Sequence, residues 1–208
     1  MATSIIRQGG RSRMRKRAEG GFSLLEVLIS MVVLTVGLVG LLAVFGVATA
    51  ATQTSQNDMI AKQVANEAYE SIVTARNTSQ ISWDDIQNVG STNCPISGAA
   101  TCGIFLAGLN PIYQPATTGV NAGIVGTSNY LGEQTLEEPG PDGTYGDADD
   151  LMIPLTNYQR TIQIAQLQDA DGNVVPTLRS ITITVQYTVP QRNGPKTYVL
   201  NSYISQYP

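Results

Sequence analysis

Glu26 is the residue of this chain whose position most needs a chemical explanation. It stands directly before residues 27–51, a run of 25 residues without a charged side chain. An uncharged apolar run of that length can cross a bilayer as a helix. A carboxylate in such a span costs about 2.5–3.5 kcal/mol at mid-bilayer, taking the value for Asp as a guide, and less near the interface. We therefore expect Glu26 to have a functional reason for its place, and a charged partner.

The residues around Glu26 resemble the signal of type IV prepilins. Gly21 and Phe22 precede it, a basic stretch lies before them, and the apolar run follows. In that family a peptidase cuts after the Gly, the new N-terminal Phe is N-methylated, and a Glu is fifth in the mature chain. The resemblance implies cleavage between Gly21 and Phe22, methylation of the Phe22 amine and a role of Glu26 in assembly. The implied partners are other pilin subunits, the prepilin peptidase and N-methyltransferase, the inner-membrane assembly platform and the membrane itself.

Elementary electrostatics agrees with a pairing role for Glu26. Phe22 and Glu26 are one helical turn apart. Cleavage after Gly21 would create a cationic amine at the positive end of the helix macrodipole, which disfavours the amine and favours the carboxylate. Opposite charges attract strongly at low dielectric constant and are tolerable there when paired. The resemblance implies that Glu26 of one subunit attracts the Phe22 amine of another. The alternative is a signal anchor with an incidental Glu at its boundary.

Three glycines, Gly37, Gly40 and Gly46, interrupt the apolar run. Each costs about 1 kcal/mol of helix propensity relative to Ala. They permit either close helix packing, as small residues do in membranes, or local melting of the helix in a filament. The stretch 33–41 most resembles the PilV subgroup of minor pilins, which often carry a Gly-Leu-x-Gly element at this depth. Pseudopilins of type II secretion share much of the same helix.

Charge is distributed unevenly along the 208 residues. Six of the 12 basic residues precede Gly21, and the chain from Phe22 onward holds 6 basic and 15 acidic residues, a formal charge of −9. Basic residues before a span predict a cytoplasmic N-terminus, so we expect a single-pass inner-membrane protein with a periplasmic domain that then reaches the pilus or cell surface. The acidic domain argues against nucleic-acid binding. An ordinary secretory signal is the alternative, but its apolar region would be shorter.

The first part of the chain predicts one long helix. From Gln53 to Arg76 there is no Gly or Pro, and apolar residues recur in two adjacent rows at helical spacing. The rows are Ile60, Val64, Ala68 and Ile72, and Ala61, Ala65, Tyr69 and Val73. A helix from Phe22 to Arg76 would be about 80 Å long, apolar all round in its first half and amphipathic in its second. The expected organisation is a leader at 1–21, a transmembrane and assembly half at 22–51, and a globular domain at 52–208.

The C-terminal third predicts antiparallel strands. Residues 181–189 alternate apolar and polar side chains, and similar patterns occupy 158–168 and 197–204. Turn residues lie between them, at 169–173 and 193–194. Three strands covering the amphipathic half of the helix make an α+β fold, the architecture that the pilin resemblance also implies. Residues 90–146 hold 11 of the 20 Gly and half of the Pro, and we expect loops there.

Cys94 and Cys102 are the only cysteines. An even number of cysteines in an exported domain favours a disulfide, and the alternative is two free buried thiols. The chain contains no His, so the cysteines lack the companions of a metal site.

An acidic stretch offers a second candidate for chemistry. Residues 133–150 hold seven acids and no base. Turn residues lie between Asp142 and Asp147, and Asp149 and Asp150 follow closely. Such spacing can place oxygen ligands around Ca²⁺. The bidentate Glu of an EF-hand loop is missing, and a solvated acidic loop is the plainer interpretation. No other cofactor is expected.

The sequence contains no catalytic constellation: it has no His, no G-x-S-x-G and no phosphate-binding loop. We therefore expect a protein that is not an enzyme. The leading hypothesis is a minor pilin, a structural and assembly subunit of a type IV pilus. The alternatives are a minor pseudopilin of type II secretion and a membrane-tethered domain whose acidic loop holds a ligand.

Overall fold

A computed structural model describes residues 23–189 and 193–207 of the chain. The leader, Gly21 and Phe22 fall outside the described residues, so the predictions for them stay predictions. In chain order the elements are α1 (Leu24–Asn77), β1 (Asn110–Pro111), β2 (Tyr113–Pro115), β3 (Tyr130–Glu133), β4 (Thr135–Glu138), β5 (Leu151–Pro154), β6 (Tyr158–Gln168), β7 (Val174–Thr188) and β8 (Pro195–Ser205).

The predicted long helix is present as α1, without a break. It ends where Ser79 adopts a left-handed backbone conformation (φ 56°), and the N–H of Gln80 then donates back to the carbonyl of Ala75 at 2.9 Å. Such a closure satisfies a carbonyl that the ended helix leaves without a partner. The chain divides into two compact units, one ending at Ala48 and the other spanning Thr49–Pro208.

The main sheet of the second unit has the strand order β1-β6-β7-β8, and every neighbouring pair is antiparallel. Side chains alternate between the two faces of each strand. Ile162 of β6, Ile181, Ile183 and Val185 of β7, and Ile204 of β8 all lie on the buried face. Their alternation is the pattern from which the strands were predicted.

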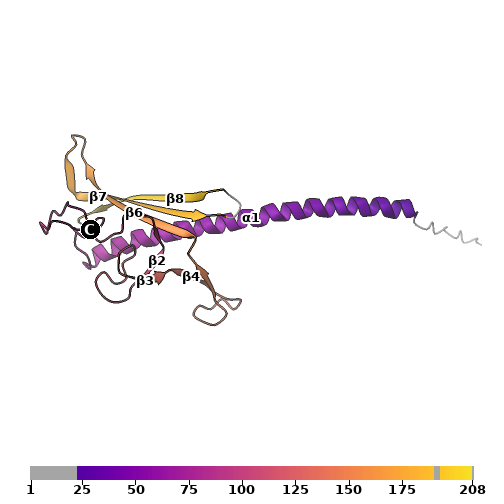
Figure 1. The fold of residues 1–208 in the computed structure, drawn as a ribbon, viewed down its shortest axis with the longest axis horizontal. Coiled ribbons are helices and arrows are strands. Elements are labelled where there is room, and N and C mark those ends of the chain that lie inside the picture. Colours follow the sequence, from indigo (N-terminus) through magenta and orange to yellow (C-terminus); the bar gives the residue numbers. More distant parts are fainter. Residues whose placement is uncertain (1–22, 190–192, 208) are drawn as a thin grey trace, which may run out of the picture. The chain divides into compact units, whose positions relative to one another are not determined.

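The second half of α1 packs on this buried face (Figure 1). The helix residues in the core are mostly small: Ala61, Val64, Ala65, Ala68, Ile72 and Ala75. Small side chains let the helix backbone approach the sheet closely, while the branched side chains of the strands fill the layer between them. The predicted α+β architecture, a long helix against an antiparallel sheet, is confirmed.

The loop prediction for residues 90–146 was incomplete. That segment contributes β1 to the main sheet, β2 and β3 to one small sheet, and β4 to a second small sheet with β5, which follows the segment. None of these strands exceeds four residues, so too few alternations exist to reveal them in the sequence. Strand β7 also begins earlier than expected, at Val174. The predicted turn at residues 169–173 joins β6 and β7, and the N–H of Asp169 donates to the carbonyl of Asn173 at 2.8 Å.

Candidate functional site

Glu26 lies in the first turn of α1. The carbonyl of Ser23 accepts hydrogen bonds from the backbone N–H of Glu26 at 2.9 Å and of Val27 at 3.2 Å, which begins the helix. The carboxylate is therefore placed where the helix macrodipole favours a negative charge. No hydrogen bond or ion pair of its side chain occurs within the described part of the chain.

The helix that follows Glu26 is apolar and exposed on every side. Leu24, Val36 and Val47 are 81%, 68% and 73% exposed, and their neighbours are similar. Ser30 and Thr35 are polar exceptions, and their hydroxyls donate to the carbonyls of Glu26 and Val32 within the same helix. Length and composition make α1 the described helix that could cross a membrane. So much exposed apolar surface requires a cover of lipid or of other helices.

Comparison with known proteins identifies this part of the chain. Residues 16–42 match a family described as the prokaryotic N-terminal methylation motif. The match includes Gly21, Phe22 and Glu26, and it ends within the apolar run. No curated protein and no solved structure matches the chain. The domain after Ala48 therefore has no relative among them, and its description rests on its own residues.

The motif and the fold together suggest a class of protein. The chain carries an N-terminal methylation motif of the type IV prepilin kind, followed by an apolar helix and a pilin-like α+β fold. This motif suggests a pilin or pseudopilin, a class whose members are typically structural subunits rather than enzymes. The motif implies processing by a prepilin peptidase and assembly with pilins, and the apolar helix is consistent with anchoring in the inner membrane before assembly.

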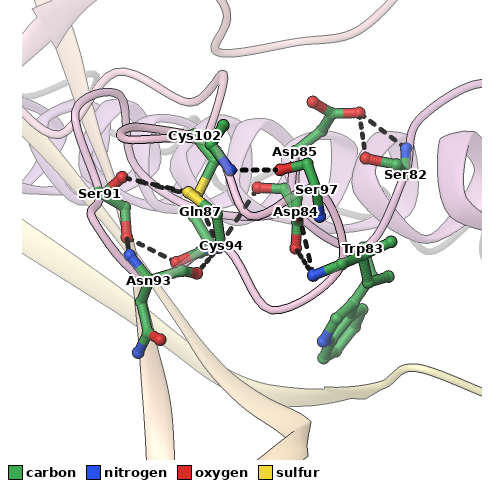
Figure 2. The surroundings of a disulfide bond; sticks show 12 residues. Ser82, Trp83, Asp84, Asp85, Gln87, Ser91, Asn93, Cys94, Ser97 and Cys102 are labelled. Carbon is green, nitrogen blue, oxygen red and sulfur yellow. Dashed lines mark hydrogen bonds between the residues drawn. A yellow bond between two sulfur atoms is a disulfide. The ribbon is translucent and has the colours of Figure 1, made fainter.

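A disulfide joins Cys94 to Cys102, close to Gln87 and Ser91 (Figure 2). It closes an exposed loop whose position is fixed by Asp84, a carboxylate that is only 4% exposed. Asp84 accepts hydrogen bonds from the backbone N–H of Ile96 at 3.2 Å and of Ser97 at 2.6 Å. Burial opposes ionisation, but these hydrogen bonds prevail and lower the pKa of Asp84. Asp84 is thus a structural anchor of this loop.

Buried Arg179 of β7 holds the segment that contains Trp83 and Ile86. Its guanidinium lies 4.2 Å from the centre of the Trp83 ring. It also donates to the carbonyls of Trp83 and Ile86. Burial lowers the pKa of Arg179 to about 10, against the opposing effect of the Asp84 carboxylate. This contact could not be predicted from the sequence, because an Arg within an alternating strand gives no sign of which loop it will contact.

Two further contacts tie the second half of α1 to the sheet, and neither was predicted. The ammonium of Lys196 lies 2.6 Å from the Asp58 carboxylate, which also accepts a hydrogen bond from the Tyr187 hydroxyl at 2.5 Å. Arg160 is 5% exposed and donates to the carbonyl of Val64 at 3.2 Å. These charged residues lie far apart in the sequence, so only the folded chain brings them together.

The acidic stretch forms the tip of the β4–β5 hairpin. Carboxylate oxygens of Asp142, Asp147 and Asp149 lie within 4.8 Å of one another, and all three side chains are exposed. Asp150 is not in that group. Its carboxylate accepts hydrogen bonds from the backbone N–H of Gly140 at 3.2 Å and of Gly146 at 2.5 Å. Calcium binding stays a prediction for this hairpin. A rise in melting temperature at millimolar Ca²⁺, absent in an Asp147→Asn variant, would support it.

Proposed function

We propose that this chain is a minor pilin of the PilV type, a structural and assembly subunit of a type IV pilus. The observation that carries the proposal is the position of Glu26, a carboxylate in the first turn of an apolar, exposed helix within the methylation motif. In the proposal the prepilin peptidase cleaves after Gly21 and the Phe22 amine is methylated. Residues 1–21 are then the leader, 22–51 the transmembrane and assembly half, and 52–208 the periplasmic domain.

Assembly follows from the electrostatics of that first turn. A subunit leaving the membrane brings its Glu26 into a bundle of apolar helices, where an unpaired charge costs about 3–5 kcal/mol. The Phe22 amine of a neighbouring subunit is the matching charge. Pairing the two fixes the axial register of one helix against the next, while the apolar side chains around them replace lipid with protein.

Substitution of Glu26 tests this mechanism. Glu26→Ala should insert and be cleaved normally, because the span becomes more apolar and the cleavage residues are unchanged. The processed protein should accumulate in the inner membrane and be depleted from sheared pili. The amount of Glu26→Asp in sheared pili should lie between the amounts of Glu26→Ala and wild type, since the shorter Asp side chain keeps the charge but reaches less far. Equal amounts of Glu26→Ala and wild type in sheared pili would contradict the pairing mechanism.

Mass spectrometry of the N-terminal peptide tests the processing step separately. The mature chain should begin at methylated Phe22. A chain that begins at Met1, or one cut near Ala50, would contradict the proposal and favour a signal anchor or a secretory signal.

A minor pseudopilin of type II secretion is the second candidate, because the same motif and apolar helix serve both machines. Detection of the wild-type protein in sheared, purified pili favours the pilus. Its absence from pili, together with a secretion defect in a deletion strain, favours the pseudopilin.

A further inference from the structure

The two edges of the main sheet are built differently. The β1 edge consists of two residues, one of which is Pro111. The β8 edge runs over 11 residues, paired with β7 without a shift in register from Pro195 to Ser205. Within the described residues, nothing pairs with the other side of β8. One edge is thus short and blocked, and the other is long, regular and open (Figure 1).

Hydrogen bonding at the end of β8 shows which of its backbone groups are free. The N–H of Gln206 donates to the carbonyl of Thr177, at 2.8 Å, as the ladder between β7 and β8 continues. Because backbone groups alternate in direction along a strand, the even-numbered residues of β8 face β7 and the odd-numbered ones face the open edge. Consistent with this, the Ser205 carbonyl accepts a hydrogen bond from Arg76 rather than from β7.

The open stretch has definite limits. Pro195 has no N–H to offer, and Arg76 already occupies the carbonyl of Ser205. Between them the odd-numbered residues Thr197, Val199, Asn201 and Tyr203 present free donors and acceptors. Residues 197–203 span about 23 Å, enough to pair with one short strand.

Natural edge strands are usually protected against such pairing by a bulge, an internal Pro, a charged side chain or short length. Strand β8 lacks these devices between Thr197 and Tyr203. Its one charge, on Lys196, is neutralised by Asp58. Val199 and Tyr203 are 47% and 64% exposed on the face away from the helix, while Tyr198 and Leu200 contact the core on the other face.

We propose that the β8 edge is a docking site for an extended, uncharged segment of another exported protein, added to the sheet as a further strand. The backbone of the guest pairs with the odd-numbered residues of β8, a mode of recognition that depends on main-chain hydrogen bonds. Guest side chains beside Tyr198 and Leu200 are apolar, and those beside Val199 and Asn201 are neutral. Because the chain from Phe22 onward carries a formal charge of −9, with 6 basic and 15 acidic residues, this neutral stretch admits a partner without charge repulsion.

Amide exchange on the full chain in detergent micelles tests the proposal. The probe is a blocked synthetic peptide with the sequence of residues 197–203, which is uncharged and has the required alternation. Bound peptide should slow exchange at Thr197, Val199, Asn201 and Tyr203 about tenfold, the factor that corresponds to the net free energy of one backbone hydrogen bond. The even-numbered amides already bond to β7 and should change little. Equal slowing along β8, or none at excess peptide, would overturn the proposal.

Matched variants separate backbone pairing from side-chain contact. Val199→Pro removes one N–H at the open edge without touching the β7 ladder and should abolish the protection, whereas Val199→Thr should keep it. A peptide N-methylated at alternate residues makes the same test without altering the protein. A peptide with Glu at the positions of Val199 and Asn201 should also fail to protect. If the chain alone shows concentration-dependent protection of the odd-numbered amides, the occupant is a second copy and the proposal of a different partner is wrong.

Discussion

The two halves of α1 have the same secondary structure but different reasons for being stable. From Leu24 to Val47 the helix exposes apolar side chains in every direction. From Ala61 to Ala75 it buries a stripe of small residues against the sheet. Isolated helices gain little stability from propensity alone, so each half depends on what covers it. The first half must be covered by lipid or neighbouring helices, and the second is covered by its own domain.

Charged residues differ between the halves in the same way. Glu26 lacks a partner within the described chain, whereas Asp58 is paired with Lys196 at 2.6 Å and Glu67 lies 3.9 Å from Arg160. In the second half the tertiary structure supplies the opposite charge. In the first half the proposed mechanism requires a neighbouring subunit to supply it. Under that proposal, the half of the helix that lacks contacts with its own domain is the half used in assembly.

The largest expected effect on stability comes from shortening a buried side chain in the second half of α1. Ile72 is fully buried, so Ile72→Ala should lower the free energy of unfolding by about 2–5 kcal/mol. Denaturation of the full chain in detergent, followed by fluorescence of the single tryptophan, Trp83, measures this. Val36→Ala, at a position 68% exposed, is the matched control and should leave the Trp83 transition unchanged. Equal losses of unfolding free energy in Ile72→Ala and Val36→Ala would contradict the difference between the two halves of α1.

The next effect concerns the disulfide loop that follows α1. Replacing both Cys94 and Cys102 by Ser should lower the free energy of unfolding by about 2.5 kcal/mol, because the open chain gains conformational entropy when unfolded. Alkylation of the wild-type protein, unfolded in denaturant without reductant, should label neither cysteine. Full labelling would contradict the oxidised state.

A smaller effect is expected from the Asp58 contact, and it depends on pH. Hydrogen bonds from Lys196 and then from Tyr187 lower the pKa of Asp58, against an opposing effect of burial. A carboxyl whose pKa is lowered by folding stabilises the fold above its unfolded pKa of about 3.9, and that stability is lost as pH falls through the folded value. Because the Asp58 side chain is 35% exposed, we expect less than about 1 kcal/mol.

Unfolding curves of wild type and Asp58→Asn at several pH values test this contact. The variant should be less stable near neutral pH and should approach the wild type in acid. Glu70→Gln, a change of an exposed carboxylate on the same helix, serves as the control and should leave the pH dependence as in the wild type. An unchanged pH dependence in Asp58→Asn would exclude the contact as a source of stability.

The smallest effect on stability is expected from Gly40→Ala in the first half. A Cβ at Gly40 would meet no atom within 4 Å, and the change raises helix propensity by about 1 kcal/mol. The midpoint of the unfolding transition followed by Trp83 fluorescence should not change. The amount of protein in sheared pili should nevertheless fall, because either proposed role of the glycine, close packing or local melting, is lost. Unchanged incorporation would show that Gly40 has no part in assembly.

Much of this architecture could be predicted from the sequence because its signals are local. The absence of charge over residues 27–51 and the helical spacing of Val64, Ala68 and Ile72 predicted α1 to within two residues at each end. Period-two alternation likewise predicted β6 and most of β7 and β8. These patterns are readable because a helix or strand with one buried face must repeat its apolar residues at a fixed spacing.

Other features were decided only by the tertiary structure. Strand β1 has two residues, and pairing with β6 rather than its own pattern makes it a strand. Arg179 reads as an ordinary charge in the sequence, yet the fold buries it beneath Trp83. That β8 lies at an open edge depends on the order in which strands meet. By itself the sequence determined which segments are apolar and where a lone carboxylate stands among them. Contacts between distant residues belong to the folded chain, because no local spacing encodes a partner far away along the sequence.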